Sequence, residues 1–91
     1  MDYRERKYYL LQLPLSPYSH QYTNTVLNML RRIPVHYRKI HLREFNIDHR
    51  CHEILISFKP EVQQKFDELK IEILRRFIVA FIEITKENYG Q

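Results

Sequence analysis

The sequence has little of the two residues that many functional motifs require. Gly90 is its only glycine, so a glycine-rich phosphate loop and a dinucleotide-binding fingerprint are both excluded. Cys51 is its only cysteine, which excludes an internal disulfide framework and a paired-cysteine zinc site and suits a reducing compartment. The longest unbroken apolar run, Phe77–Ile82, is too short to cross a bilayer, and the charged segment Met1–Lys7 does not resemble a signal peptide. We therefore expect a soluble protein with no membrane contact, located in the cytoplasm or, in a eukaryote, in the nucleus.

The chain nevertheless contains enough apolar residues for a folded core. Hydrophobic residues make up 44% of it, and its 91 residues leave room for a single domain, residues 1–91. The net charge of +4 is uneven, because residues 1–50 hold nine basic and four acidic residues (+5), whereas residues 51–91 hold six and seven (−1). A basic first half indicates contact with nucleic acid or with an acidic partner, although a solvated basic surface has the same composition.

The spacing of apolar residues and helix breakers predicts an α+β fold of five elements. A strand is expected at residues 7–13, followed by a helix at residues 17–32 that Ser16 and Pro17 begin and Pro34 ends. A second strand at Val35–Asn46 and a third at His52–Phe58 should form a hairpin. A long helix is expected to begin at Pro60.

The end of that long helix is ambiguous in the sequence. Either it continues to Asn88, or it ends near Arg76 and Phe77–Thr85 forms a fourth strand. The residue types favour a strand, whereas the absence of any helix breaker favours one helix. If the segment is a single helix, we expect a sheet of three antiparallel strands in the order 1-3-2, with two helices on one face. Such a helix of about 28 residues would be about 42 Å long and apolar all round at its end, which predicts a protein partner.

No catalytic or metal site is expected. His49, Cys51 and His52 are close in sequence, but the last two are adjacent and would point to opposite faces of a strand. Cys51 has histidines nearby but no oxyanion hole, and Glu44 and Asp48 are acids expected to be solvated near a turn. We therefore predict a protein that is not an enzyme and has no cofactor.

Basic residues flank the end of the first helix and the hairpin, with aromatic residues between them. Basic side chains bind phosphates and aromatic rings stack on bases, so this pattern is typical of RNA binding. A charged, solvated face beside core aromatics is an alternative that the sequence leaves open. The aromatic residues concerned are Tyr18, Tyr22, Tyr37 and Phe45.

The order and length of the elements resemble the small Pcc-type dimerisation subunit of the KEOPS (EKC) complex, a family that includes cancer/testis-antigen-like proteins. Residues 11–15 (LQLPL) resemble the end of its first strand, and residues 35–39 (VHYRK) resemble the entry to its second. Residues 54–59 (ILISFK) and 74–82 (LRRFIVAFI) are similar to its third strand and its apolar partner-binding helix. Residues 66–67 (FD) replace the leucine-arginine pair usual at the start of that helix, which implies a divergent paralogue.

This resemblance implies a non-catalytic scaffold subunit that supports threonylcarbamoyladenosine (t6A) modification of tRNA. It would form a homodimer, or a heterodimer with a paralogous Pcc-type subunit, and would bind the transferase subunit and contact tRNA. The implied partner-binding residues are Phe66, Leu69, Ile73, Leu74, Phe77, Ile78, Phe81 and Ile82. The implied tRNA-contacting residues are Arg31, Arg32, Arg38, Lys39, Arg43, Arg75 and Arg76.

The three-stranded sheet would leave its first strand as an open, apolar edge, which is an aggregation risk unless it is paired. Two such edges would pair into a six-stranded sheet. The predicted dimer interface consists of Tyr8, Tyr9, Leu10, Leu11 and Leu13. The alternative hypothesis is a free-standing ferredoxin-like RNA-binding domain, in which the fourth strand covers that edge.

Overall fold

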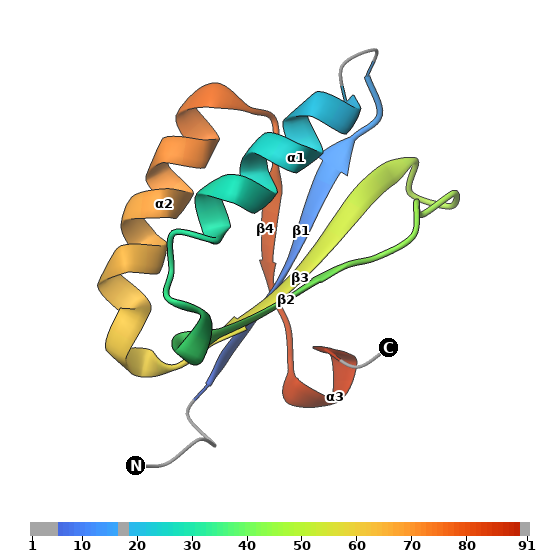
Figure 1. Cartoon of the computed structure of the whole chain (residues 1–91). Coiled ribbons are helices and arrows are strands. Elements are labelled where there is room, and N and C mark those ends of the chain that lie inside the picture. The colour runs from blue at the N-terminus through green and yellow to red at the C-terminus, as the bar shows by residue number, and fades with distance from the viewer. Residues whose placement is uncertain (1–5, 17–18, 90–91) are drawn as a thin grey trace.

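The computed structural model describes residues 6–16 and 19–89, and its fold is α+β with a single antiparallel sheet (Figure 1). Four strands lie in the order β2-β3-β1-β4. The strands are β1 (Lys7–Pro14), β2 (Arg38–Leu42), β3 (Cys51–Phe58) and β4 (Ala80–Glu83). The helices are α1 (Ser19–Leu30), α2 (Gln63–Arg76) and α3 (Lys86–Tyr89), with short 3-10 turns at Val35–Tyr37 and Pro60–Val62.

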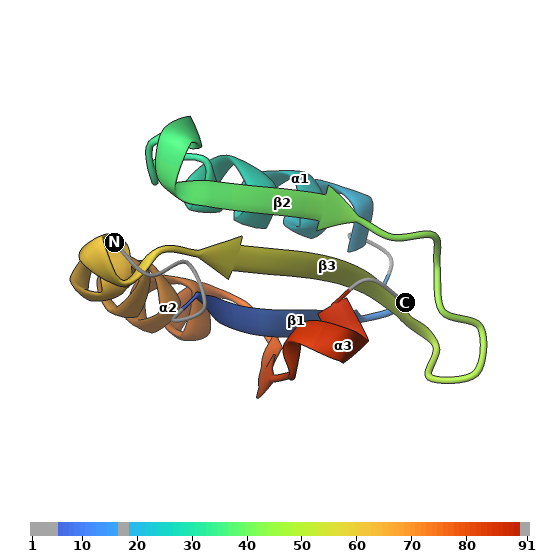
Figure 2. The ribbon, with the colours of Figure 1, turned by 90° about the horizontal axis from the view of Figure 1, so that it is seen from below.

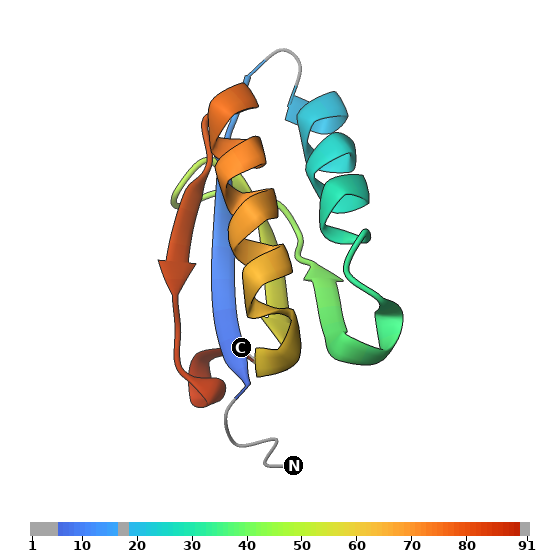
Figure 3. The same cartoon turned by 90° about the vertical axis from the view of Figure 1, so that its left-hand side faces the viewer.

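The two central strands carry the most apolar sequence. β1 pairs antiparallel with β3 along its whole length, with Leu11 opposite Ile54. Leu11, Ile54 and Ile56 are fully buried, because α1 and α2 cover this face of the sheet (Figure 3). Apolar, strand-forming residues therefore build the inner face of the sheet, and β3 is buried on both of its faces.

An aromatic cluster joins α2 to this face. Phe66 of α2 is fully buried, and its ring centroid lies 4.3 Å from that of Phe58 and 4.8 Å from that of Tyr9. Leu69 and Ile73 follow Phe66 at helical spacing and are also buried. The amphipathic stripe of α2 therefore belongs to the core of this chain.

The prediction of three strands and one long helix is wrong, because the chain has a fourth strand. α2 ends at Arg76, and Phe77 is already extended (φ −135°, ψ 154°). β4 then pairs antiparallel with β1, placing Phe81 opposite Leu11. The β-branched and aromatic residues after Arg76 suit a strand, and the reversal of the chain sets the Phe81 ring 6.0 Å from that of Phe66. The fourth strand of the alternative hypothesis is thus present, at Ala80–Glu83.

The fourth strand also changes the position of β1. Since β1 lies between β3 and β4, it is not an open edge, and the premise of pairing two β1 edges is wrong. Leu11 and Leu13 are buried within one copy of the chain. Dimerisation through Tyr8, Tyr9 and Leu10 remains a prediction, but the open β1 edge on which it was based is absent from this sheet.

The remaining boundaries differ in detail. The predicted second strand is shorter, because a 3-10 turn after Pro34 precedes β2 and only an isolated bridge, Asn46 to Cys51, continues the pairing beyond it. The third strand is confirmed to within one residue. α1 is described from Ser19, so the expected helix start at Pro17 lies outside the described residues. None of the described helices is long and apolar enough to cross a membrane.

Candidate nucleic-acid interface

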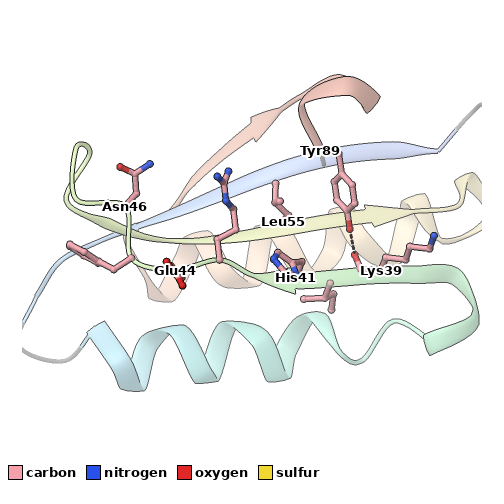
Figure 4. A pocket seen from close by; sticks show the side chains of 9 residues that line it. Lys39, His41, Glu44, Asn46, Leu55 and Tyr89 are labelled. Carbon is pink, nitrogen blue, oxygen red and sulfur yellow. Dashed lines mark hydrogen bonds between the residues drawn. The ribbon is translucent and has the colours of Figure 1, made fainter. Parts of the chain in front are cut away.

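A groove of about 850 Å³ lies on the sheet face opposite α1 and α2, over β2 and β3 (Figure 4). α3 crosses the same face beside it (Figure 2). The groove is lined by Lys39, Ile40, His41, Arg43, Glu44, Phe45, Asn46, Leu55 and Tyr89. Lys39 and Arg43 thus meet the carboxylate of Glu44, and a second carboxylate, that of Glu53, pairs with Arg43, so charge alone is a weak attraction and an aromatic ring has to contribute.

The basic side of the groove follows from strand alternation. Lys39 lies opposite Ser57 and His41 opposite Leu55, and these pairs share the outer face of the sheet. Arg43 continues the pattern, because its N–H donates to the carbonyl of Glu53 at 3.0 Å. β2 is an edge strand, so its basic residues border open solvent.

A buried carboxylate anchors the far end of the groove. Glu53 is only 2% exposed, and it accepts hydrogen bonds from Nε2 of Gln12 at 2.9 Å and Nδ2 of Asn46 at 3.2 Å. Its Oε1 lies 3.8 Å from Nη1 of Arg43. Asn46 in turn accepts a hydrogen bond from the backbone N–H of His49, 3.0 Å away. Glu53 therefore holds Arg43 and Asn46 beside the groove before any ligand arrives.

Aromatic rings stand at both ends of the groove. Phe45 is 39% exposed and makes an edge contact with His52, with ring centroids 5.1 Å apart. Tyr89 donates its hydroxyl to the carbonyl of Lys39 at 3.1 Å, and its ring makes an edge contact with Tyr8 at 5.2 Å. Of these two rings only that of Phe45 is exposed, and an exposed ring beside cations suits an unstacked base and its phosphate.

The structure divides the predicted tRNA-contacting residues between two sides of the molecule. Lys39 and Arg43 line the groove, whereas the Nε of Arg38 donates to the carbonyl of Ile33 at 2.8 Å. Arg31, Arg32, Arg75 and Arg76 all lie at the ends of the helices.

Those helix-side cations have carboxylate or amide neighbours. Arg32 and Arg76 lie 2.9 Å and 3.5 Å from the carboxylate of Glu72, and Arg31 bonds Asn28 at 3.3 Å. Arg75 lines a smaller groove of about 350 Å³ that also contains Arg32 and Glu72. Arg32 and Arg76 are therefore compensated by Glu72, as Arg43 is by Glu53, and all four helix-side cations lie away from the aromatic groove.

Six groove residues were absent from the sequence-based site: Ile40, His41, Glu44, Asn46, Leu55 and Tyr89. The period-two pattern of β2 could have identified His41, because Lys39 lies on the same face. Nothing in the sequence indicated Tyr89, since its place depends on the return of the chain through β4. Tyr18, an aromatic residue of the predicted pattern, lies outside the described residues.

The predicted partner-binding residues do not form one helical face. Phe66, Leu69 and Ile73 belong to the core of the chain, and Phe77 and Phe81 are half-buried against it. Leu74, Ile78 and Ile82 are exposed, Ile78 most of all at 83%. They lie on α2, on the following turn and on β4.

The histidines and the cysteine offer no reactive cluster. Within residues 6–16 and 19–89, no three His, Cys, Asp or Glu residues come together as metal ligands. Cys51 is 4% exposed, and burial, assisted by the charge of Glu53, raises the pKa of its thiol. A buried thiol held in its protonated form is a poor nucleophile.

Comparisons of the chain with protein-family models, with curated proteins and with solved structures found no match. The resemblance to Pcc-type subunits therefore remains a prediction.

Proposed function

We propose that this protein binds single-stranded RNA on the outer face of its sheet, with the groove over β2 and β3 as the main contact. One observation supports this most: Lys39, Arg43 and the exposed ring of Phe45 line a single groove. No described α1 or α2 residue lines this groove. A face with both cations and rings can bind phosphates and bases together.

Three groove residues have roles in RNA binding that follow from their chemistry. Lys39 and Arg43 contact phosphate oxygens, and the guanidinium of Arg43 is held in place by Glu53. Phe45 stacks on a base, for which its exposed face is suited. Because the groove holds few fixed charges, we expect moderate affinity and weak sequence preference.

The test measures the binding of a labelled single-stranded RNA of about 12 nucleotides by fluorescence anisotropy. The double variant Lys39→Gln and Arg43→Gln removes two positive charges but leaves an amide donor beside Glu53. We expect its affinity to fall about 10- to 30-fold at about 0.1 M salt. The slope of log K against log salt should become shallower by about 1.4, since each lost phosphate contact removes about 0.7.

The matched control is Arg31→Gln with Arg75→Gln, which changes the net charge by the same amount on the helix side. We expect it to bind nearly as the unaltered chain does. If the control loses affinity and the groove variant does not, RNA binds the helix side and the proposed site is wrong. If the unaltered chain binds single-stranded DNA as tightly and RNA has no advantage, the proposal for RNA is wrong as well.

A second candidate is the scaffold role in the KEOPS complex, for which one observation can be cited. Leu74, Ile78 and Ile82 belong to the predicted partner-binding set and are exposed, on α2, on the turn after it and on β4. Isolated exposed apolar side chains are common, but three within nine residues of the predicted partner-binding segment favour a partner. In this proposal the chain binds the transferase subunit through these residues.

The second candidate is tested by co-purification with that transferase subunit. Leu74→Asp with Ile78→Asp should abolish the interaction while the circular dichroism spectrum stays unchanged, since both side chains are exposed. Ile71→Asp, a further exposed apolar position on α2, is the control that should leave it intact. Failure of the unaltered chain to bind the transferase subunit would contradict this role.

A further inference from the structure

The outer face of the sheet is partly covered by the smallest helix of the chain. α3 has four residues, none of them buried. It crosses the face opposite α1 and α2 (Figure 2). Its contacts with the sheet include one hydrogen bond, from the Tyr89 hydroxyl to the carbonyl of Lys39, and one ring contact, to Tyr8.

The surface beside α3 is more apolar than an open sheet face requires. Leu55 is only 3% exposed, although its outward position on β3 faces away from α1 and α2. It lines the groove together with Tyr89 (Figure 4). Tyr8 is half-buried on the same face, and Leu10 follows it at strand spacing. A tyrosine ring beside leucine side chains is a surface on which an unstacked base can lie.

We propose that this covered surface, Tyr8 with Leu10 and Leu55, is a further base-binding site, and that Tyr89 of α3 occupies it in the free protein. Bound RNA displaces Tyr89 and continues from the groove across β3 to β1. This inference rests on the proposed function, since it extends the same RNA along the same face.

The contacts of α3 are weak enough for such an exchange. An exposed hydrogen bond and one edge contact between rings each favour the closed position of α3 by only about fivefold. A ligand that binds only the uncovered face has its affinity lowered by the fraction of molecules in which the face is covered. Removing α3 should therefore tighten RNA binding.

The experiment compares the full chain with a chain that ends at Thr85. The deleted segment contains Lys86 and Glu87, whose charges cancel, so the net charge stays the same. We expect the shortened chain to bind the labelled single-stranded RNA about 5- to 30-fold more tightly. Tyr89→Ala should reproduce most of this gain, and Glu87→Gln, on the same helix, should not.

Hydrogen exchange gives a readout that affinity alone does not. The N–H groups of Asn88 and Tyr89 donate to the carbonyl of Thr85, both at 3.1 Å. If RNA displaces α3, their exchange in the full chain should accelerate when RNA is added. Slower exchange, together with weaker binding by the Tyr89→Ala variant, would mean that Tyr89 itself stacks on RNA and would overturn the proposal.

The outcomes separate this inference from the proposed function. If the full chain binds RNA and the shortened chain binds equally or less well, the groove stands and displacement of α3 is wrong. If neither chain binds, the proposed function fails and the inference fails with it. If only the shortened chain binds RNA, the result supports both the proposed function and the displacement of α3, and α3 is then a strong inhibitor of RNA binding.

Discussion

The two faces of the sheet differ in what holds their residues in place. On the face under α1 and α2, Leu11, Ile56 and Phe66 are fully buried and pack against one another. On the outer face, Lys39 and His41 are exposed, and the buried Glu53 is held by hydrogen bonds to Gln12 and Asn46. The difference shows how a small domain can separate stability from binding, because apolar burial under α1 and α2 stabilises one face, while the edge strand β2 keeps charged side chains on the other exposed.

The largest effect on stability should come from the sheet face that α1 and α2 cover. Phe66→Ala removes a ring that contacts Phe58 and Tyr9, and should lower the free energy of unfolding by about 3–5 kcal/mol. Urea unfolding followed by circular dichroism measures this change. Leu74→Ala, on the exposed side of the same helix, should cost no more than about 0.5 kcal/mol. Equal effects would contradict the placement of the core.

A smaller effect on stability should come from β4, the edge strand that pairs with β1. The N–H of Ile84 donates to Tyr8 at 2.9 Å, so by alternation the N–H of Ile82 points toward β1 and that of Glu83 points to solvent. Ile82→Pro should therefore destabilise the chain by about 1–3 kcal/mol, as measured by urea unfolding. Glu83→Pro should have much less effect. Similar losses from both prolines would instead indicate a continuous helix through this segment.

The smallest effect concerns how the free energy of unfolding depends on pH, through Tyr9 on the sheet face under α1 and α2. Burial foremost, then the charges of Glu83 and Asp67, raise the pKa of Tyr9 above its usual value of 10.0. As pH rises past 10 the unfolded chain loses this proton first, so the unfolded state binds fewer protons and the free energy of unfolding declines. Tyr9→Phe should make that decline shallower.

This measurement uses urea unfolding between about pH 9 and pH 11 in a Cys51→Ala background, because burial raises the pKa of that thiol too. An unaltered decline in the Tyr9→Phe chain would show that other groups cause it.

Much of the fold follows from local sequence. The alternation in residues 52–58 predicted a strand that the structure confirms to within one residue. The stripe of Phe66, Leu69 and Ile73 predicted a helix that is present but ends at Arg76. The segment after Arg76 could not be assigned this way, because apolar residues without breakers suit a buried helix and a strand equally. Pairing with β1, which is distant in sequence, decided it.

The candidate site shows the same division. Its basic residues were visible in the sequence, and the alternation of β2 assigns Lys39 to the outer face. Which cations belong together was not visible, since Arg31 and Arg75 lie on the other side of the sheet from Lys39 and Arg43. Tyr89 reaches Lys39 only because β4 returns along β1.

The sequence by itself determined which segments are apolar and with what period, and therefore most of the elements and the side of each that is buried. These properties act between neighbours in the chain, through side-chain spacing, proline and charge. The tertiary structure decided the fourth strand, the enclosure of β1 and the meeting of Tyr89 with Lys39. Those features depend on contacts between residues far apart in the chain, whose free energy appears only when the whole sheet and its helices form together.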